Sequence, residues 1–175
     1  ISIFSLNKIL ELGTGSGAIA IAIASEKTNI NIKASDIKDN IIKIARKNAD
    51  LYEIKNIKFV KSNWFSDIKK NNFDLIVSNP PYVSSNDPVL RNSDIKFEPV
   101  SALVSGNDGL DDLKKIIRES SDYLKNNGWL IVEHAYDQGA KVRKLFLENE
   151  FTSKTIKDYN KLERITFGRL LKKNG

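Results

Sequence analysis

The sequence predicts a three-layer α/β sandwich built on a mostly parallel sheet, and two patterns carry this prediction. Short apolar runs alternate along the chain with stretches of helical length, as expected of strands joined by helical crossovers. Several apolar runs end abruptly in glycine, acidic or proline turns, and ligands bind at such strand ends in open parallel sheets. We expect one domain over residues 1–175, of which residues 1–7 are a linker from a preceding region, because no methionine occurs even at position 1.

Composition excludes several classes of protein. The chain has no cysteine, which rules out a disulfide framework and a cysteine metal site, and we expect no bound metal. Neither a signal-like start nor an apolar run near the roughly 20 residues of a membrane span is present, so we expect a cytoplasmic protein without membrane contact. The net charge of +6 admits nucleic-acid binding. Because the lysines are interleaved with acidic residues, as on a solvated surface, we do not expect nucleic acid as the partner.

The first unit is a strand, a glycine-rich turn and a helix. A strand over Lys8–Leu12 leads into Gly13-Thr14-Gly15-Ser16-Gly17, and Ala18–Ser25 has the composition of a buried helix. The glycines permit positive φ angles and a close approach of a ligand, and amides at the helix start favour a negatively charged group. The turn also fits the loose dinucleotide fingerprint. A tight turn without a ligand is the alternative.

The second unit ends its strand, Asn31–Ser35, in an acidic residue. Asp36 lies about 20 residues after the glycine turn, where a carboxylate accepts hydrogen bonds from the hydroxyls of a ribose. Alternatively, Asp36 merely caps the helix predicted over Lys38–Leu51. Apolar residues at helical spacing predict a core-facing stripe made of Ile37, Ile41, Ile44, Ala45 and Ala49.

The third predicted strand, Asn56–Lys61, ends in Ser62-Asn63-Trp64-Phe65. A polar side chain followed by aromatic residues at this position suits an adenine ring, because Asn63 can bond the edge of the base and an aromatic ring can cover its face. The alternative is that Trp64 and Phe65 are ordinary core aromatics beneath a loop.

The fourth predicted strand, Phe73–Ser78, runs into Asn79-Pro80-Pro81-Tyr82. Successive prolines fix φ, remove two backbone donors and keep the preceding residues out of the helical region, so this stretch is a stiff extended corner. The carbonyls of Asn79 and Pro80, together with the Asn79 amide, offer acceptors for the two hydrogens of a planar NH2 group. Tyr82 is placed to cover a flat substrate.

The remainder of the chain continues the alternation. Residues 83–108 lack periodicity, and a loop of this length directly after the corner is expected to cover the substrate. We expect the later elements to be a helix over Leu110–Asn126, a strand over Trp129–Glu133, a helix over Asp137–Glu150, and strands over Phe151–Lys157 and Arg164–Lys172, the last pair placing an antiparallel strand in the sheet. The single histidine, His134, has no neighbouring pattern that completes a catalytic triad, so a structural hydrogen-bonding role is favoured over that of a general base.

Taken together, the glycine turn from Glu11 to Gly17, the acid Asp36 and the Ser78-Asn79-Pro80-Pro81-Tyr82 stretch resemble class I S-adenosylmethionine-dependent methyltransferases. Further matches follow in the order found in the HemK/PrmC family, which methylates the glutamine of the Gly-Gly-Gln loop of peptide chain release factors. They are Asn63-Trp64-Phe65, Phe97-Glu98-Pro99, Ala102-Leu103-Val104, Gly109-Leu110, Glu133-His134, Asp137-Gln138-Gly139, Asp158-Tyr159, Glu163-Arg164 and Gly168-Arg169. The resemblance covers Lys8 to about Leu171.

The resemblance implies the class I methyltransferase fold, a Rossmann-like seven-stranded sheet with an antiparallel last strand. It implies S-adenosyl-L-methionine as cofactor, a release factor as protein substrate and methyl transfer to glutamine N5, and we expect a monomer. The implied cofactor residues are Glu11, Gly13, Thr14, Gly15, Gly17, Asp36, Asn63, Trp64 and Asn79. The implied catalytic residues are Asn79, Pro80, Pro81 and Tyr82.

Two departures from the family pattern stand out. The family commonly has Asp at the position of Asn63, so this chain lacks a charge near the adenine. The helical region that precedes the catalytic domain in the family, and that helps recognise the release factor, is missing from this sequence.

Other functions fit parts of the pattern. N6-adenine methyltransferases of nucleic acids share the Asn-Pro-Pro-Tyr corner, and ribosomal-protein glutamine methyltransferases are close relatives. A non-catalytic binding module is a further alternative, but it does not account for the intact Asn79-Pro80-Pro81-Tyr82 corner. A dehydrogenase accounts for the glycine turn and Asp36 but not for the prolines.

Overall fold

The structure, a computed structural model, describes residues 6–70, 72–91 and 102–171. Its centre is a seven-stranded sheet with strand order β3-β2-β1-β4-β5-β7-β6. The strands are β1 (Lys8–Leu12), β2 (Asn31–Asp36), β3 (Ile57–Lys61), β4 (Phe73–Ser78), β5 (Leu124–Glu133), β6 (Lys154–Lys157) and β7 (Glu163–Arg169). Strands β3, β2, β1, β4 and β5 pair in parallel, whereas β7 runs antiparallel to both β5 and β6. The predicted sheet is therefore confirmed.

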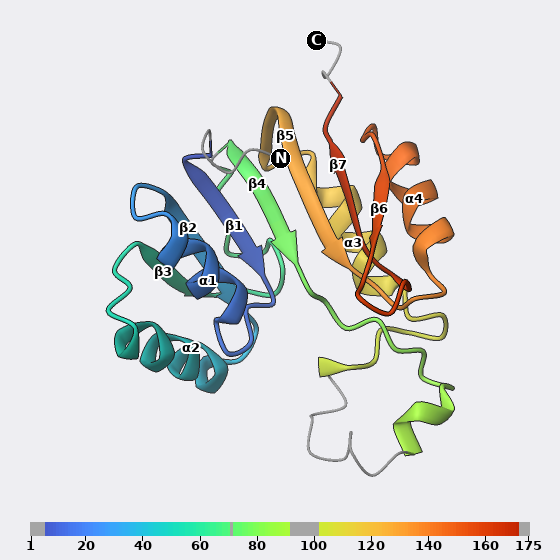
Figure 1. Cartoon of the computed structure of the whole chain (residues 1–175), viewed down its shortest axis with the longest axis horizontal. Coiled ribbons are helices and arrows are strands. Elements are labelled where there is room, and N and C mark those ends of the chain that lie inside the picture. The colour runs from blue at the N-terminus through green and yellow to red at the C-terminus, as the bar shows by residue number, and fades with distance from the viewer. Residues whose placement is uncertain (1–5, 71, 92–101, 172–175) are drawn as a thin grey trace.

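Helices cover the sheet on both faces (Figure 1). On one face lie α1 (Ala18–Glu26) and α2 (Asp39–Leu51), which contact β2 and β3. On the other face lie α3 (Asp111–Ser120) and α4 (Gly139–Glu148), which contact β5, β6 and β7. Alternation along the strands sends Ile9 into the apolar core beneath α1 and Leu10 into the core beneath α3 and α4. The three predicted layers are thus present.

β4 is buried along its whole length, from Phe73 to Ser78, because it lies between β1 and β5 and has core on both faces. The central position of this strand gives the corner that follows it a rigid base. Viewed in Figure 1, the arrowheads of β1, β4 and β5 point to the same lower edge of the sheet, and residues 79–91 leave β4 there.

The predicted helix over Leu110–Asn126 is wrong in its second half. The helix ends at Ser120, and Leu124 already belongs to β5, where it pairs with Phe73. The Asn126-Asn127-Gly128 turn lies inside β5 as an irregularity, since Leu75 pairs next with Trp129. Leu124 is buried as the apolar spacing requires, but a strand and not a helix buries it.

The predicted stripe on α2 is also wrong in part. Ile37 and Ile44 are 53% and 46% exposed, whereas Ile42, Ala45 and Ala49 face the core. Ile37 precedes the helix, which begins at Asp39, so it does not follow the helical period.

The long loop is described only at its two ends. After the corner, Val83 pairs with Val104, and Pro88–Arg91 form a short 3₁₀ helix. The predicted packing residues Phe97 and Val100 lie outside the described residues, as do residues 1–5 of the predicted linker; Leu6 is buried in the core beneath α1. Over the described ranges, no helix combines the length and apolar character needed to cross a membrane.

Candidate functional site

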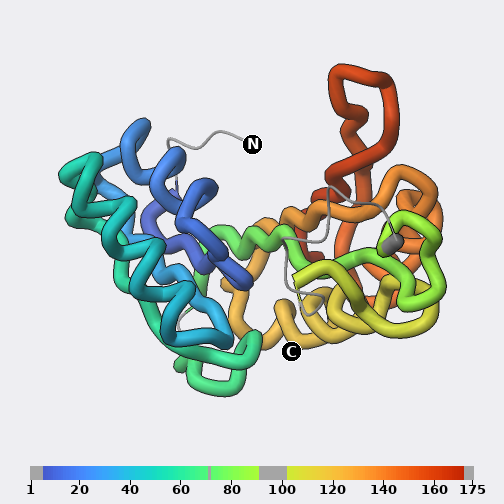
Figure 2. The backbone as a smooth tube through the Cα atoms, turned by 90° about the horizontal axis from the view of Figure 1, so that it is seen from below, coloured from blue at the N-terminus to red at the C-terminus, as the bar shows by residue number. Residues whose placement is uncertain are grey.

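The glycine turn and the proline corner lie side by side at the carboxyl edge of the sheet. They follow β1 and β4, which are neighbours, with Leu12 opposite Ser78 in the register. A methyl group added to Gly13 would lie 3.9 Å from the carbonyl oxygen of Asn79 and 3.4 Å from the Trp64 ring. Figure 2 looks onto this edge from below. Three regions that the sequence separates thus meet at one place.

The glycine turn has the backbone conformation that its composition predicts. Gly13, Gly15 and Gly17 all have positive φ, at 69°, 55° and 87°. The loop closes through a hydrogen bond from the Gly17 amide to the Thr14 carbonyl, 2.9 Å, and the Thr14 amide bonds to the Ser35 carbonyl, 2.8 Å. No described atom lies within 4 Å of a methyl group built on Gly15, so the loop leaves open space above that residue.

Glu11, at the end of β1, is a buried acid beneath this loop. Its side chain is 1% exposed, and the Thr14 hydroxyl donates a 2.5 Å hydrogen bond to its carboxylate. Burial disfavours the charged form and raises the pKa of Glu11 from 4.5 to about 7, although the Thr14 bond acts in the opposite direction. A cationic group bound above the loop would therefore favour the ionised form of the Glu11 carboxyl, whose pKa lies close to neutral pH.

Asp36 contacts both the glycine turn and the start of α2. One carboxylate oxygen accepts the Gly15 amide and the other accepts the Lys38 amide, each at 3.1 Å. The bond to Lys38 is a turn ahead of α2 and not a helix cap, because Lys38 itself holds the N-cap position and no side-chain capping bond is found there among the described residues. The carboxylate is also half-buried beside the loop, where a ribose role requires it. That role stays a prediction.

The two adjacent aromatic residues have different surroundings. Phe65 is a core residue, 2% exposed and stacked on Tyr123 with ring centroids 4.4 Å apart. Trp64 lies half-buried against Gly13, with φ at 52°, and its indole Nε1 donates to Asp112 at 2.9 Å. Asn63 is exposed. The core alternative thus holds for Phe65, while Trp64 remains available to a ligand above the loop.

The corner keeps its acceptors unused. Asn79 is exposed and Pro80 is buried, and no described residue donates a hydrogen bond to the Asn79 side chain or to the carbonyl of either residue. Pro81 and Tyr82 are half-buried. The Tyr82 hydroxyl donates to the Glu133 carboxylate at 3.2 Å. Chemically, the corner can accept hydrogen bonds from an amide NH2 next to whatever occupies the glycine turn.

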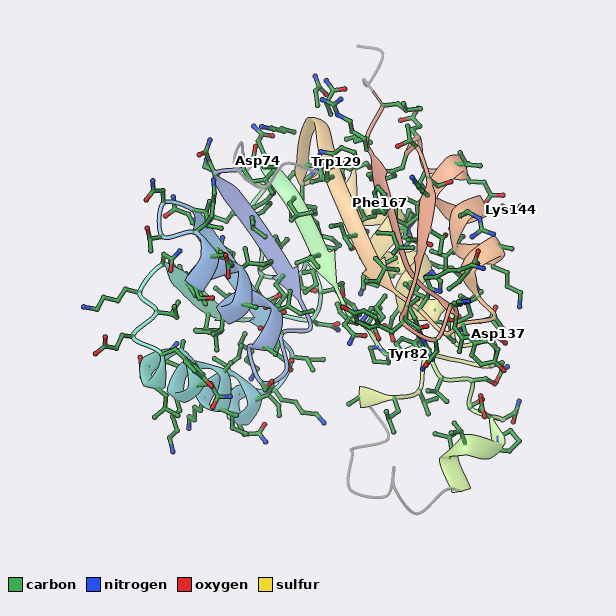
Figure 3. All side chains as sticks on the ribbon, in the orientation of Figure 1. Asp74, Tyr82, Trp129, Asp137, Lys144 and Phe167 are labelled. Atoms are coloured by element: carbon green, nitrogen blue, oxygen red, sulfur yellow. The ribbon has the colours of Figure 1, made fainter. Side chains whose placement is uncertain are left out.

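Three residues that support this site carried no assigned role in the sequence interpretation. Asp112 accepts from Trp64 and from the Ser105 hydroxyl, 2.8 Å, and so links the aromatic wall to the end of the long loop. Glu133 holds the Tyr82 hydroxyl, and Gln138 donates to the Tyr82 carbonyl at 2.9 Å. These partners lie 48 to 56 positions away along the chain, so no local pattern could have identified them. In Figure 3, Tyr82 and Asp137, the neighbour of Gln138, lie at the lower edge of the sheet, away from Asp74 and Trp129.

His134 has the structural role that the sequence favoured. It is fully buried, its Nδ1 lies 2.8 Å from the Ala135 carbonyl, and its Nε2 lies 2.9 Å from the Thr166 hydroxyl. Burial lowers the pKa of His134, so the neutral ring is favoured. The contact with Thr166 fastens the end of β5 to β7.

The sequence matches a protein family described as "Methyltransferase domain" over residues 3–174. It is 43% identical over 163 residues to a release factor glutamine methyltransferase of Aliivibrio fischeri, covering 92% of this chain and 57% of that protein. It is 46% identical over 162 residues to the protein of the same name from Buchnera aphidicola, covering 92% and 58%. The chain therefore spans under two thirds of the length of these relatives. The expected resemblance is confirmed.

Solved structures share the fold. A ribosomal protein L11 methylase from Lactobacillus delbrueckii superposes with a TM-score of 0.70 at 23% identity, covering 97% of this chain and 73% of that one. A methyltransferase from Pyrococcus furiosus gives a TM-score of 0.71 at 19% identity, covering 97% and 79%. At these identities the likeness establishes the class I methyltransferase fold alone.

Proposed function

Because the chain belongs to the methyltransferase domain family, we propose that it transfers the methyl group of S-adenosyl-L-methionine to the side-chain amide nitrogen of the Gly-Gly-Gln glutamine in peptide chain release factors. The observation that carries the proposal is the row of unused acceptors at Asn79 and Pro80, beside the glycine turn. The names of the relatives support the choice of acceptor.

The glycine turn and its neighbours fit the proposed cofactor. Open space above Gly15 would admit the amino acid part, the Asp36 carboxylate would accept hydrogen bonds from the ribose, and Trp64 with Asn63 would border the adenine. Glu11, with its pKa near 7, supplies a carboxyl beneath the loop that gains charge when a cationic ligand approaches. When bound, S-adenosylmethionine supplies an electrophilic methyl group on a sulfonium.

The acceptors at the corner would compensate for the low nucleophilicity of the substrate amide. An amide nitrogen is a poor nucleophile because its lone pair is delocalised into the carbonyl. Accepting both N–H hydrogens, at the Asn79 side chain and the Pro80 carbonyl, would orient the nitrogen and stabilise the positive charge that develops on it as its bond to the methyl carbon forms and the methyl–sulfur bond breaks. One of the two hydrogens would then leave as a proton to solvent, which restores a neutral amide. Such positioning and electrostatic effects are worth several kcal/mol each. Tyr82, anchored by Glu133, borders the flat amide.

We propose a release factor as the partner. We also propose that the protein acts in the cytoplasm, where release factors work. We propose residues 1–175 as the catalytic domain, with residues 1–7 leading into it. A monomer stays a prediction.

The decisive experiment measures methyl transfer from labelled S-adenosylmethionine to a purified release factor. The matched control is the same release factor with its Gly-Gly-Gln glutamine changed to alanine. Label on the first protein and none on the second supports the proposal. Cofactor binding without label on either protein would refute this acceptor, and DNA and ribosomal proteins would then be tested in the same assay.

A further inference from the structure

We infer that Gln138 is a positioning residue for methyl transfer, which holds the proline corner in its working geometry through the Tyr82 carbonyl. The inference rests on the proposed function and adds to it a residue outside the glycine turn and the corner. Gln138 belongs to the Asp137-Gln138-Gly139 stretch, immediately before α4, and its side chain is 5% exposed.

The corner needs an anchor because the sheet ends before it. β4 stops at Ser78, and Tyr82 lies four positions beyond the last ladder pair. Glu133 fixes the Tyr82 ring by accepting a hydrogen bond from its hydroxyl. Gln138 holds the backbone at the Tyr82 carbonyl, one residue before the bridge between Val83 and Val104, and the backbone determines where the Asn79 and Pro80 acceptors point.

Both the donor and the acceptor of the Gln138 side-chain amide have hydrogen-bond partners. Its Nε2 donates to the carbonyl of Tyr82 at 2.9 Å and approaches those of Asp108 and Gly109 at 3.3 and 3.4 Å. Its Oε1 accepts the Ala135 amide at 2.9 Å. Three carbonyls on one side and an N–H on the other fix which way the amide faces. A buried side chain with these bonds joins the segment just after β5, the end of the long loop and the corner.

Two glycines next to this amide are tightly packed. Gly109 has φ at 70°, and a methyl group there would collide with the Tyr82 carbonyl oxygen and lie 2.7 Å from Gln138 Nε2. Gly139 is equally confined, because a methyl group would collide with the Glu163 carboxylate. Gly109 lets the end of the long loop approach Tyr82 and Gln138, whereas Gly139 lets the start of α4 approach Glu163 of β7. Gln138 touches none of the glycine turn, so its role concerns the acceptor and not the cofactor.

The test is Gln138→Glu, which keeps the size of the side chain and an acceptor for Ala135 but replaces the donor with an oxygen facing carbonyls. We expect kcat for release factor methylation to fall about 10- to 100-fold, as for a small misplacement of reacting groups, while the cofactor Kd changes less than about 3-fold. Activity relative to wild type should recover as the pH is lowered, because a protonated carboxyl donates again. Ser120→Ala, which removes another buried hydrogen bond far from the corner, is the control for general destabilisation and should retain wild-type kcat.

A second readout does not depend on the acceptor. Hydrogen exchange of the segment around residues 79–85, where the Val83 amide bonds to the Leu103 carbonyl at 2.8 Å, should be faster in Gln138→Glu than in wild type or in Ser120→Ala. Unchanged exchange, an unchanged kcat, or a loss of activity that only follows a parallel loss of cofactor binding would overturn the inference. Failure of wild type to label the release factor would refute the proposed function instead, and the exchange measurement would still decide the role of Gln138.

Discussion

The two halves of the site are built in different ways. The cofactor half uses backbone amides and glycines of one short turn, with Asp36 supplied by the next strand. The acceptor half begins with four consecutive residues, but its geometry depends on Glu133, Gln138 and the space at Gly109. The conformation of the glycine turn is determined by its own residues, so it can be predicted from the local sequence. The orientation of the two acceptors at the corner depends on residues that lie far away in the sequence. Variants that separate binding from turnover test this difference.

The largest effect is expected from Asn79→Ala. Removing one acceptor of the amide hydrogens should lower kcat about 10²- to 10³-fold, the range found for losing one oxyanion-hole donor, and leave cofactor affinity nearly unchanged. Radiolabel transfer and calorimetric titration measure the two quantities. Asn48→Ala is the control on the cofactor side of the site. The Asn48 side-chain amide donates to the Ser16 carbonyl of the glycine turn at 2.8 Å, so this variant changes the turn and not the corner. Equal losses of kcat and affinity in Asn79→Ala would contradict the division.

Glu11→Gln tests the buried acid beneath the cofactor loop through pH. The pKa of Glu11 is raised from 4.5 to about 7, so the folded state binds an extra proton between these values and stability falls as pH rises through that window. The wild type should lose about 3 kcal/mol of unfolding free energy from pH 4.5 to 7 relative to the Gln variant. Denaturant unfolding of both proteins across this range measures it. Parallel stability curves would show that Glu11 titrates normally.

Alanine substitutions at Gly15 and Gly17 distinguish a glycine that borders the proposed cofactor space from one that is packed against neighbouring side chains. Alanine at either position incurs about 1–2 kcal/mol for a positive φ. Gly17→Ala should destabilise further, since its methyl group would lie 3.2 Å from the Ile21 side chain and 3.3 Å from the Ala45 side chain. Gly15→Ala meets no described neighbour within 4 Å, so its main effect should be on cofactor affinity. Thermal unfolding and titration of both variants decide whether the two effects divide in this way.

The smallest effect is expected from Trp64→Phe, compared with Phe65→Leu. The first removes the indole bond to Asp112 but keeps an aromatic face, which should cost about 1 kcal/mol, seen as a several-fold weaker cofactor Kd. The second disturbs a core ring and should lower stability by about 1–2 kcal/mol without changing the Kd of the folded protein. A weaker Kd in Phe65→Leu alone would reverse the roles assigned to the pair.

The comparison also explains what the sequence could predict. The first four strands, the glycine turn and the proline corner have signals contained within a few residues, and these strands were predicted with nearly the observed bounds; β5 begins at Leu124, five residues before its predicted start, and β6 and β7 are shorter than predicted. Leu124 was misassigned because its apolar spacing suits a helix, while pairing with Phe73, 51 positions away, decides its structure. Gln138 appeared in the sequence only within the Asp137-Gln138-Gly139 match and without a role, since its proposed role depends on three carbonyls that only the folded chain brings together. Sequence patterns thus identified the chemical groups but not their supports.

The antiparallel β7 has a consequence for the order in which the protein is made. It lies between β5 and β6, and the Arg164 carbonyl accepts the His134 amide at 2.9 Å, beside Glu133. A nascent chain that has emerged only as far as α4 already contains the glycine turn and the corner. It still lacks the strand that borders β5 and fastens His134 through Thr166. The site is therefore completed only after β7 has followed α4 out of the ribosome, and a chain interrupted before β7 would carry every proposed catalytic residue without the framework that positions them.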